Sequence, residues 1–143
     1  MISMESGAEL LKYIPQREPF VLVSDLYSHN DKSVISGFQV LEDHILVSGG
    51  RLQEGGLVEN MAQTAALFAG VKSHASEGEA PIGYIASIKG LKIYRLPEVD
   101  EHIKTSVEII NEVMNIQIAK ARVVDSQNHI LAECEMRIFI KPD

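Results

Sequence analysis

Residues 55–72 differ from the rest of the chain in how their apolar positions are distributed. Alanine, leucine, methionine and phenylalanine occupy nearly every side of the helix that this segment predicts, and Gly55 and Gly56 stand at its start. A helix that is apolar on all sides is normally buried inside a protein. At about 1.5 Å per residue it spans about 27 Å, so only a sheet curled around it can cover most of its surface.

The other apolar runs predict the strands of that sheet. Runs at 20–27 and 33–41 flank a polar stretch of turn-forming residues and predict a hairpin. Four further strands are expected, at 82–96, 101–110, 113–124 and 130–141. A short opening helix is expected at 6–14, because Pro15 then blocks its continuation.

Irregularities in the strand pattern predict local distortions. Gly90 is a candidate bulge or bend, and Lys120 and Arg122 fall in phase with apolar positions of their strand, which predicts a bulge or a passage from core to rim. Short connections at 111–112 and 125–129 make the last three strands an antiparallel meander. The fold class predicted is α+β, a single domain over residues 1–143 in which an antiparallel sheet wraps one long central helix.

Composition and charge limit the expected cellular location and the expected binding partners of the chain. The chain has 143 residues, 45% of them hydrophobic, and a net charge of -7, so nucleic acid is not an expected partner. Cys134 is the only cysteine and cannot form an internal disulfide. No apolar run is long enough for a membrane span, and the first residues do not resemble a signal peptide. We therefore expect a soluble, cytoplasmic protein.

Three segments resemble one enzyme family in the same order along the chain. They are LLKYIPQREPFVLVSDL (10–26), LVENMAQTA (57–65) and IKGLKIYRLPEVD (88–100). They are similar to the 3-hydroxyacyl-[acyl-carrier-protein] dehydratases of fatty-acid synthesis, and ENMAQTA is also similar to their divergent branch in aryl-polyene pigment clusters. The resemblance implies a hot-dog fold and a homodimer whose sheets join edge to edge, with each active site between subunits. It also implies thioester substrates on acyl-carrier protein or CoA.

Dehydration of a 3-hydroxyacyl thioester needs a base for the C2 proton, an acid for the hydroxyl and a donor for the thioester oxygen. Glu59 matches the family's acidic position, and the amides of Gly55 and Gly56 at the helix start are candidate donors. Gln63, one turn after Glu59, is a candidate for orienting its carboxylate or for binding substrate. Asn60 is a candidate substrate contact with a structural role as the alternative.

The family's catalytic histidine has no direct match. The usual G-H-F-P-G motif is replaced by DHILVSGG, and the family spacing falls on Ile45, one residue from His44. The shorter spacing of the aryl-polyene branch falls on Arg51, which stays protonated and cannot act as a base but can bind a carbonyl or phosphate oxygen. The remaining histidines are expected on the surface: His29, His74, His102 and His129.

The residues and the resemblance are compatible with three functions. The first is a dehydratase with Glu59 and His44 as catalytic residues, and the second is a thioester hydrolase that uses Glu59 and the helix start. The third is a non-catalytic acyl-binding subunit paired with an active paralogue, which Arg51 in place of histidine favours. No motif for a metal or other cofactor is present. Three basic residues are candidates for docking acidic acyl-carrier protein: Lys89, Lys92 and Arg95.

Overall fold

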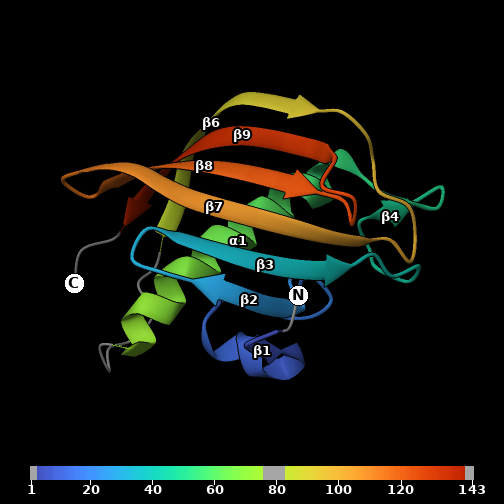
Figure 1. Ribbon diagram of the computed structural model, residues 1–143, viewed down its shortest axis with the longest axis horizontal. Helices are drawn as coiled ribbons and strands as arrows, with labels where there is room; N and C mark the ends of the chain where they lie inside the picture. The colour runs from blue at the N-terminus through green and yellow to red at the C-terminus, as the bar shows by residue number, and fades with distance from the viewer. Residues whose placement is uncertain (1–2, 76–82, 141–143) are drawn as a thin grey trace.

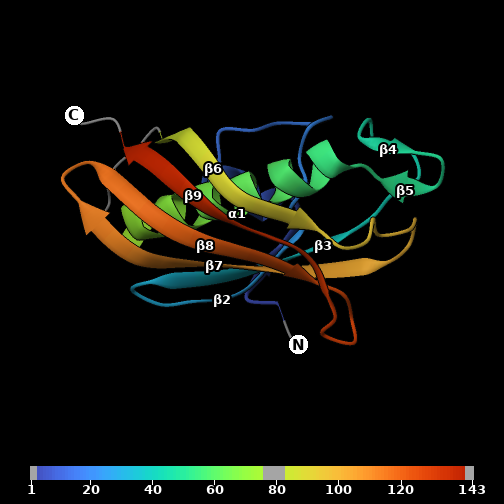
Figure 2. The ribbon, with the colours of Figure 1, turned by 90° about the horizontal axis from the view of Figure 1, so that it is seen from above.

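A seven-stranded antiparallel sheet curves around one long helix, α1 (Glu54–Ala75) (Figures 1 and 2). The structure, a computed structural model, describes residues 3–75 and 83–140. In sheet order the strands are β1 (Glu5–Ser6), β2 (Asp25–His29), β3 (Ser33–Gln39), β7 (His102–Val113), β8 (Ile116–Val124), β9 (Ile130–Ile140) and β6 (Gly83–Ile93). A 3-10 helix, η1 (Gly7–Lys12), lies at the N-terminal end, and a small hairpin joins β4 (Val47–Ser48) to β5 (Arg51–Leu52).

The predicted central helix is confirmed. Leu57, Met61, Leu67 and Phe68 of α1 are at most 2% exposed and belong to the same core as the inner face of the sheet. The helix side that carries alanines is only half-buried in the single chain: Ala62, Ala66 and Ala69. No helix in the described ranges is long and apolar enough to cross a membrane.

The predicted strand at 20–27 is wrong in its first half. Residues 20–24 form no strand, and β2 begins at Asp25. The backbone of Phe20 and Leu22 bonds instead to the side chains of Asn60 and Gln63 on α1, so the helix takes the place of a neighbouring strand. The predicted opening helix is also shorter than expected, because η1 is a 3-10 helix of six residues.

The phase of β8 corrects a second expectation. Ala119, Ala121 and Val123 face the core, so Lys120 and Arg122 lie on the outer face in an unbroken alternation. The bulge is in β7 instead, between Ile109 and Asn111. Beyond this bulge β7 continues to Val113. The turn therefore lies at Met114 and Asn115 and not at the predicted positions 111–112, and Met114 adopts a φ of 57°. The irregularity predicted at Gly90 is confirmed by a φ of 62° and a register shift between Lys89 and Lys92.

Asp125 organises the predicted turn between β8 and β9. Its Oδ1 accepts the amide N–H groups of Gln127 and His129 at 2.9 Å, and its Oδ2 accepts from Arg95 at 3.1 Å. Burial raises the pKa of the Asp125 carboxyl, but these donors lower it by more, so the pKa lies below its ordinary value. The ionised carboxylate therefore stabilises the fold.

An Asp125→Asn variant is expected to be less stable than the parent at neutral pH, by about 1–2 kcal/mol, because Arg95 loses a charged acceptor. The pKa of Asp125 is lowered by folding, so its contribution is complete above the unfolded value of about 4 and is lost as pH falls through the folded value. Urea unfolding of both proteins between neutral pH and about pH 3 checks this. A stability difference that stays constant over this range would contradict it.

Candidate functional site

An open cavity of about 480 Å³ lies beside the N-terminal turns of α1. Two of the residues predicted for the site line it, the carboxylate-bearing Glu59 and the glycine Gly55. The rest of its wall comes from the segment between η1 and β2 and from the loop before β4: Gln16, Arg17, Phe20 and Leu46. The helix therefore brings a carboxylate and a residue of its first turn to the same space.

Glu59 is half-buried in the second turn of α1. Its Oε1 accepts a hydrogen bond of 3.2 Å from Nε2 of Gln63, one helical turn later. Its Oε2 has no hydrogen-bond partner among the described residues, so this oxygen is available to a ligand in the cavity.

Gln63 is held rigidly and orients Glu59. Its side chain is 0% exposed, its Oε1 accepts the N–H of Leu22 at 2.7 Å, and its Nε2 also donates to the carbonyl of Phe20 at 2.8 Å. Both ends of the amide are thus fixed by the backbone of one extended segment. The predicted orienting role of Gln63 agrees with this geometry, whereas the side chain does not line the cavity.

Asn60 lies on the neighbouring side of α1 and is also 0% exposed. Its Nδ2 donates to the carbonyl of Leu22 at 2.8 Å, and its Oδ1 accepts from the hydroxyl of Thr105 on β7. The amide therefore joins the helix, the extended segment and the sheet, and it does not line the cavity. This favours the structural alternative over the predicted substrate contact.

The paired glycines have different surroundings. Gly55 is exposed at the cavity, and the position that a Cβ would occupy has no atom within 4 Å. The N–H of Gly55 belongs to the first turn of α1, where amides lack a carbonyl partner within the helix. Gly56 is buried, its N–H donates to the carbonyl of Gln53 at 2.9 Å, and a Cβ there would collide with Leu52. Gly55 is therefore the candidate donor, and the amide of Gly56 is used within the fold.

His44 does not present a free ring nitrogen in this structure. Its Nδ1 accepts the N–H of Leu46 at 3.1 Å, so Nε2 carries the proton and faces the carbonyl of Val21 at 3.1 Å. An imidazole bound on both sides cannot take a proton from a substrate, so the geometry speaks against the predicted base. The other four histidines are exposed, as predicted: His29, His74, His102 and His129.

Arg51 lies in the hairpin that precedes α1, away from the cavity lining. Its guanidinium approaches the carboxylate of Glu98 at 3.7 Å, and both side chains are more than half exposed. Gly49 and Gly50, with φ values of 62° and 75°, form the turn of this hairpin. The hairpin was not predicted, although two consecutive glycines between β-forming residues are its usual signal.

The sequence analysis also did not predict the side of the cavity formed by Gln16 and Arg17. Arg17 donates through one guanidinium nitrogen to the carbonyls of Ile14 and Gln16, and no described acid pairs with it. Gln16 Oε1 is buried without a hydrogen-bond donor in the described part of the chain. The segment IPQREPF contains two prolines, which restrict its backbone, and the N–H of Phe20 donates to the carbonyl of Arg17 across a turn at its end.

Known proteins share both the sequence pattern and the fold. The family model ApeP-like, described as ApeP dehydratase, matches residues 8–143. No curated protein matches the chain in sequence. Among solved structures, the dehydratase heterocomplex ApeI:P from Xenorhabdus doucetiae matches with a TM-score of 0.85 at 13% identity, covering 94% of this chain and 91% of that one.

Two proteins bound to CoA compounds have the same fold. A hypothetical thioesterase from Streptococcus pneumoniae TIGR4, solved with coenzyme A, matches with a TM-score of 0.69 at 11% identity over 83% of this chain and 86% of that one. The protein smu.793 from Streptococcus mutans UA159, bound to acetyl CoA, matches with a TM-score of 0.70 at 13% identity, covering 92% of this chain and 98% of that one. The predicted hot-dog fold is confirmed, and the match over residues 8–143 shows that the chain belongs to the ApeP-like dehydratase family.

Proposed function

We propose that this chain is a subunit of a dehydratase that removes water from 3-hydroxyacyl thioesters carried on acyl-carrier protein, in polyene-type or fatty-acid synthesis. The observation that carries the proposal is the placement of Glu59, whose oriented carboxylate and free Oε2 share an open cavity with Gly55. The family match supplies the reaction, and Glu59 supplies an acid in a position to perform part of it.

Each group has one step in this reaction. A base removes the C2 proton, and the thioester oxygen gains negative charge as an enolate that the N–H of Gly55 stabilises. The enolate then collapses to the 2,3-double bond, and protonated Glu59 gives its proton to the C3 hydroxyl, which leaves as water. Glu59 recovers a proton from the base, so no further reactant is consumed.

The base is the group for which the described residues lining the Glu59 cavity offer no free candidate. In a homodimer, the arrangement that the sequence resemblance implies, both copies bring Glu59 and both bring an internally bound His44. A paralogue with a free histidine would complete the site that holds Glu59 of this chain. The bound state of His44 therefore favours a heterodimer, and the solved relative ApeI:P is a heterocomplex.

The test is turnover of a 3-hydroxyacyl-carrier protein, followed by mass spectrometry of the carrier-bound acyl group. The chain is incubated alone and together with a hot-dog dehydratase subunit from the same organism that retains the G-H-F-P-G motif. Loss of one water in the mixture, beyond the rate of that subunit by itself, supports the proposal. Release of free carrier thiol would indicate a hydrolase instead, and an unchanged rate would contradict a catalytic contribution from this chain.

Gly55→Ala is expected to raise stability and lower turnover. The φ of Gly55 is not positive and no atom opposes an added methyl group, so alanine stabilises the helix by about 0.5–1 kcal/mol. The same methyl group enters the cavity where the thioester must approach the N–H. Thermal unfolding and steady-state kinetics measured on one preparation check both effects. Full activity at raised stability would show that no substrate approaches this amide.

A further inference from the structure

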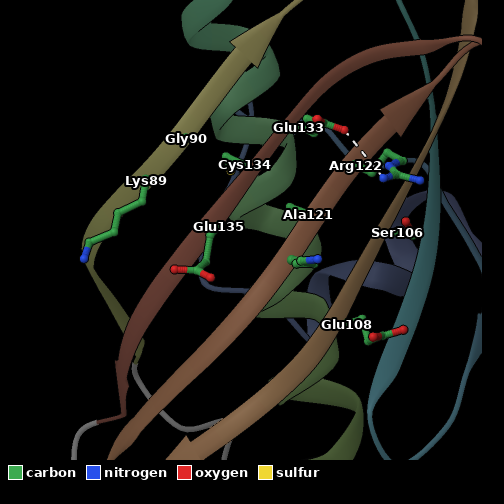
Figure 3. A pocket seen from close by; sticks show the side chains of 10 residues that line it. Lys89, Gly90, Ser106, Glu108, Ala121, Arg122, Glu133, Cys134 and Glu135 are labelled. Carbon is green, nitrogen blue, oxygen red and sulfur yellow. Dashed lines mark ion pairs between the residues drawn. The ribbon is translucent and has the colours of Figure 1, made fainter.

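Charged side chains on the outer face of the sheet alternate in sign from strand to strand. One row runs from Glu108 on β7 through Lys120 on β8 and Glu135 on β9 to Lys89 on β6. They line a hollow of about 370 Å³ on this face, which Figure 3 shows with the helix behind the sheet. Opposite charges on neighbouring strands stabilise a sheet, so the row has a defined order: minus, plus, minus, plus.

A second row beside the first ends with the same sign. Arg122 on β8 pairs in register with Glu133 on β9, and their side chains form an ion pair at 3.6 Å. Glu133 pairs in register with Lys92 on β6. Both rows therefore finish on β6 with a lysine.

The strand that carries these lysines is the edge of the sheet. β6 pairs with β9 on one side, and its other side has no strand partner among the described residues. Neither Lys89 nor Lys92 forms an ion pair within residues 3–75 and 83–140, and in Figure 3 the Lys89 side chain extends away from β9, past the free edge. Exposed apolar residues lie on and just beyond the same strand: Tyr84, Ile85, Leu91 and Tyr94.

We propose that the free edge of β6 selects, as its dimer partner, a hot-dog chain whose own edge strand carries acidic side chains on the outer face, and that it disfavours a second copy of this chain. This inference rests on the proposed dimeric dehydratase. An acidic partner strand continues both charge rows with the next sign in the alternation. It also supplies hydrogen-bond partners for the open backbone of β6, which an unpaired edge strand otherwise exposes to aggregation.

Self-pairing places like charges together. Ile88 is the middle residue of β6 (Gly83–Ile93), so two copies that pair along the whole strand have Ile88 near the two-fold axis. Lys89 of each copy is then a diagonal neighbour of Lys89 in the other, at about 7–8 Å. Lys92 of each copy adds a second positive charge on the same face of the seam. The homodimer therefore gathers four lysines, whereas an acidic partner pairs with each of them.

A docked acyl-carrier protein is the other occupant that basic residues here suggest. Of the three predicted docking residues, Arg95 already binds Glu101 and Asp125, which leaves Lys89 and Lys92. These two stand on a bare strand edge among exposed apolar side chains, a surface that is completed by another strand. The sheet edge therefore fits a partner subunit better than a transient acidic carrier.

The test uses charge reversal within this protein. The variant Lys89→Glu/Lys92→Glu is mixed with the parent chain, and native mass spectrometry separates the two self-pairs from the mixed pair by their masses. The control Lys32→Glu/Lys104→Glu has the same change in charge at positions outside β6. At low salt we expect the Kd of the mixed pair to be about ten-fold lower than the Kd of either self-pair. At high salt we expect this difference to shrink, because salt screens the charges.

Three results would overturn the proposal. They are equal affinity of the parent self-pair and the mixed pair, the same preference with the control variant, and an effect of the β6 variant on carrier-protein binding with unchanged pairing. A neutral variant, Lys89→Gln/Lys92→Gln, is expected to strengthen self-pairing without favouring the parent as a partner. Pairing is read independently of turnover, so an inactive protein with the expected preference would contradict the proposed reaction and leave the edge assignment standing.

Discussion

Replacing Glu59 with glutamine is expected to lower the dehydration rate about 10²–10⁴-fold, the range that a positioned acid or base contributes. Glutamine has nearly the shape of glutamate, and its Oε1 still accepts the hydrogen bond from Gln63. The variant keeps the packing of α1 and loses the transferable proton. The measurement is single-turnover formation of the unsaturated thioester, with pairing and thermal stability recorded for the same sample.

Glu54→Gln is the matched control. Glu54 is the first residue of the same helix, is exposed, and does not line the Glu59 cavity. The two variants make the same chemical change near one helix N-terminus. Any general electrostatic effect of losing a negative charge there is therefore common to both. If both variants lose activity equally, or if Glu59→Gln stays fully active, Glu59 is not the acid.

The central helix and most of the sheet could be predicted because their patterns depend on local sequence. Residues 55–72 are apolar on all sides, which predicts a helix buried on all sides. β9 alternates with period two, which predicts a strand with one buried face. Residues 20–24 were predicted wrongly because an apolar run does not reveal what its backbone bonds to. There the partners are side chains of α1, about 40 residues away in sequence.

The phase of β8 was misread for a related reason. Isoleucines at 116 and 118 suggest the inward side of the strand, yet the inward positions are the small Ala119 and Ala121, which face the helix. Large apolar residues on the outer face cannot be distinguished from core residues by period alone. Only the pairing with β7 and β9 fixes which side is buried.

The candidate site was predictable in part. Glu59 follows from the family pattern, and Gln63 follows from helix geometry, since residues four apart share a face. His44 could not be judged from sequence, because its two ring nitrogens are occupied by backbone groups of Leu46 and Val21 that only the fold brings there. The same holds for the lysines of β6, whose meaning depends on the strand lying at an edge.

Asn60→Ala is expected to destabilise the protein by about 2–4 kcal/mol, because it removes two buried hydrogen bonds and leaves a small cavity. The carbonyl of Leu22 and the hydroxyl of Thr105 would lose their partner in a region that is 0–1% exposed. Urea unfolding measures this effect. Asn115→Ala, at an exposed turn position, is the control and is expected to change stability by less than about 0.5 kcal/mol.

The same variant separates the two roles considered for Asn60. If Asn60 joins α1 to the segment before β2, its loss also loosens Phe20 and Gln63, and the position of Glu59 becomes less defined. Turnover then falls together with stability, and added salt or osmolyte that restores the fold restores part of the rate. A substrate contact would instead raise KM in a protein of unchanged stability, and that result would reassign Asn60 to the binding site.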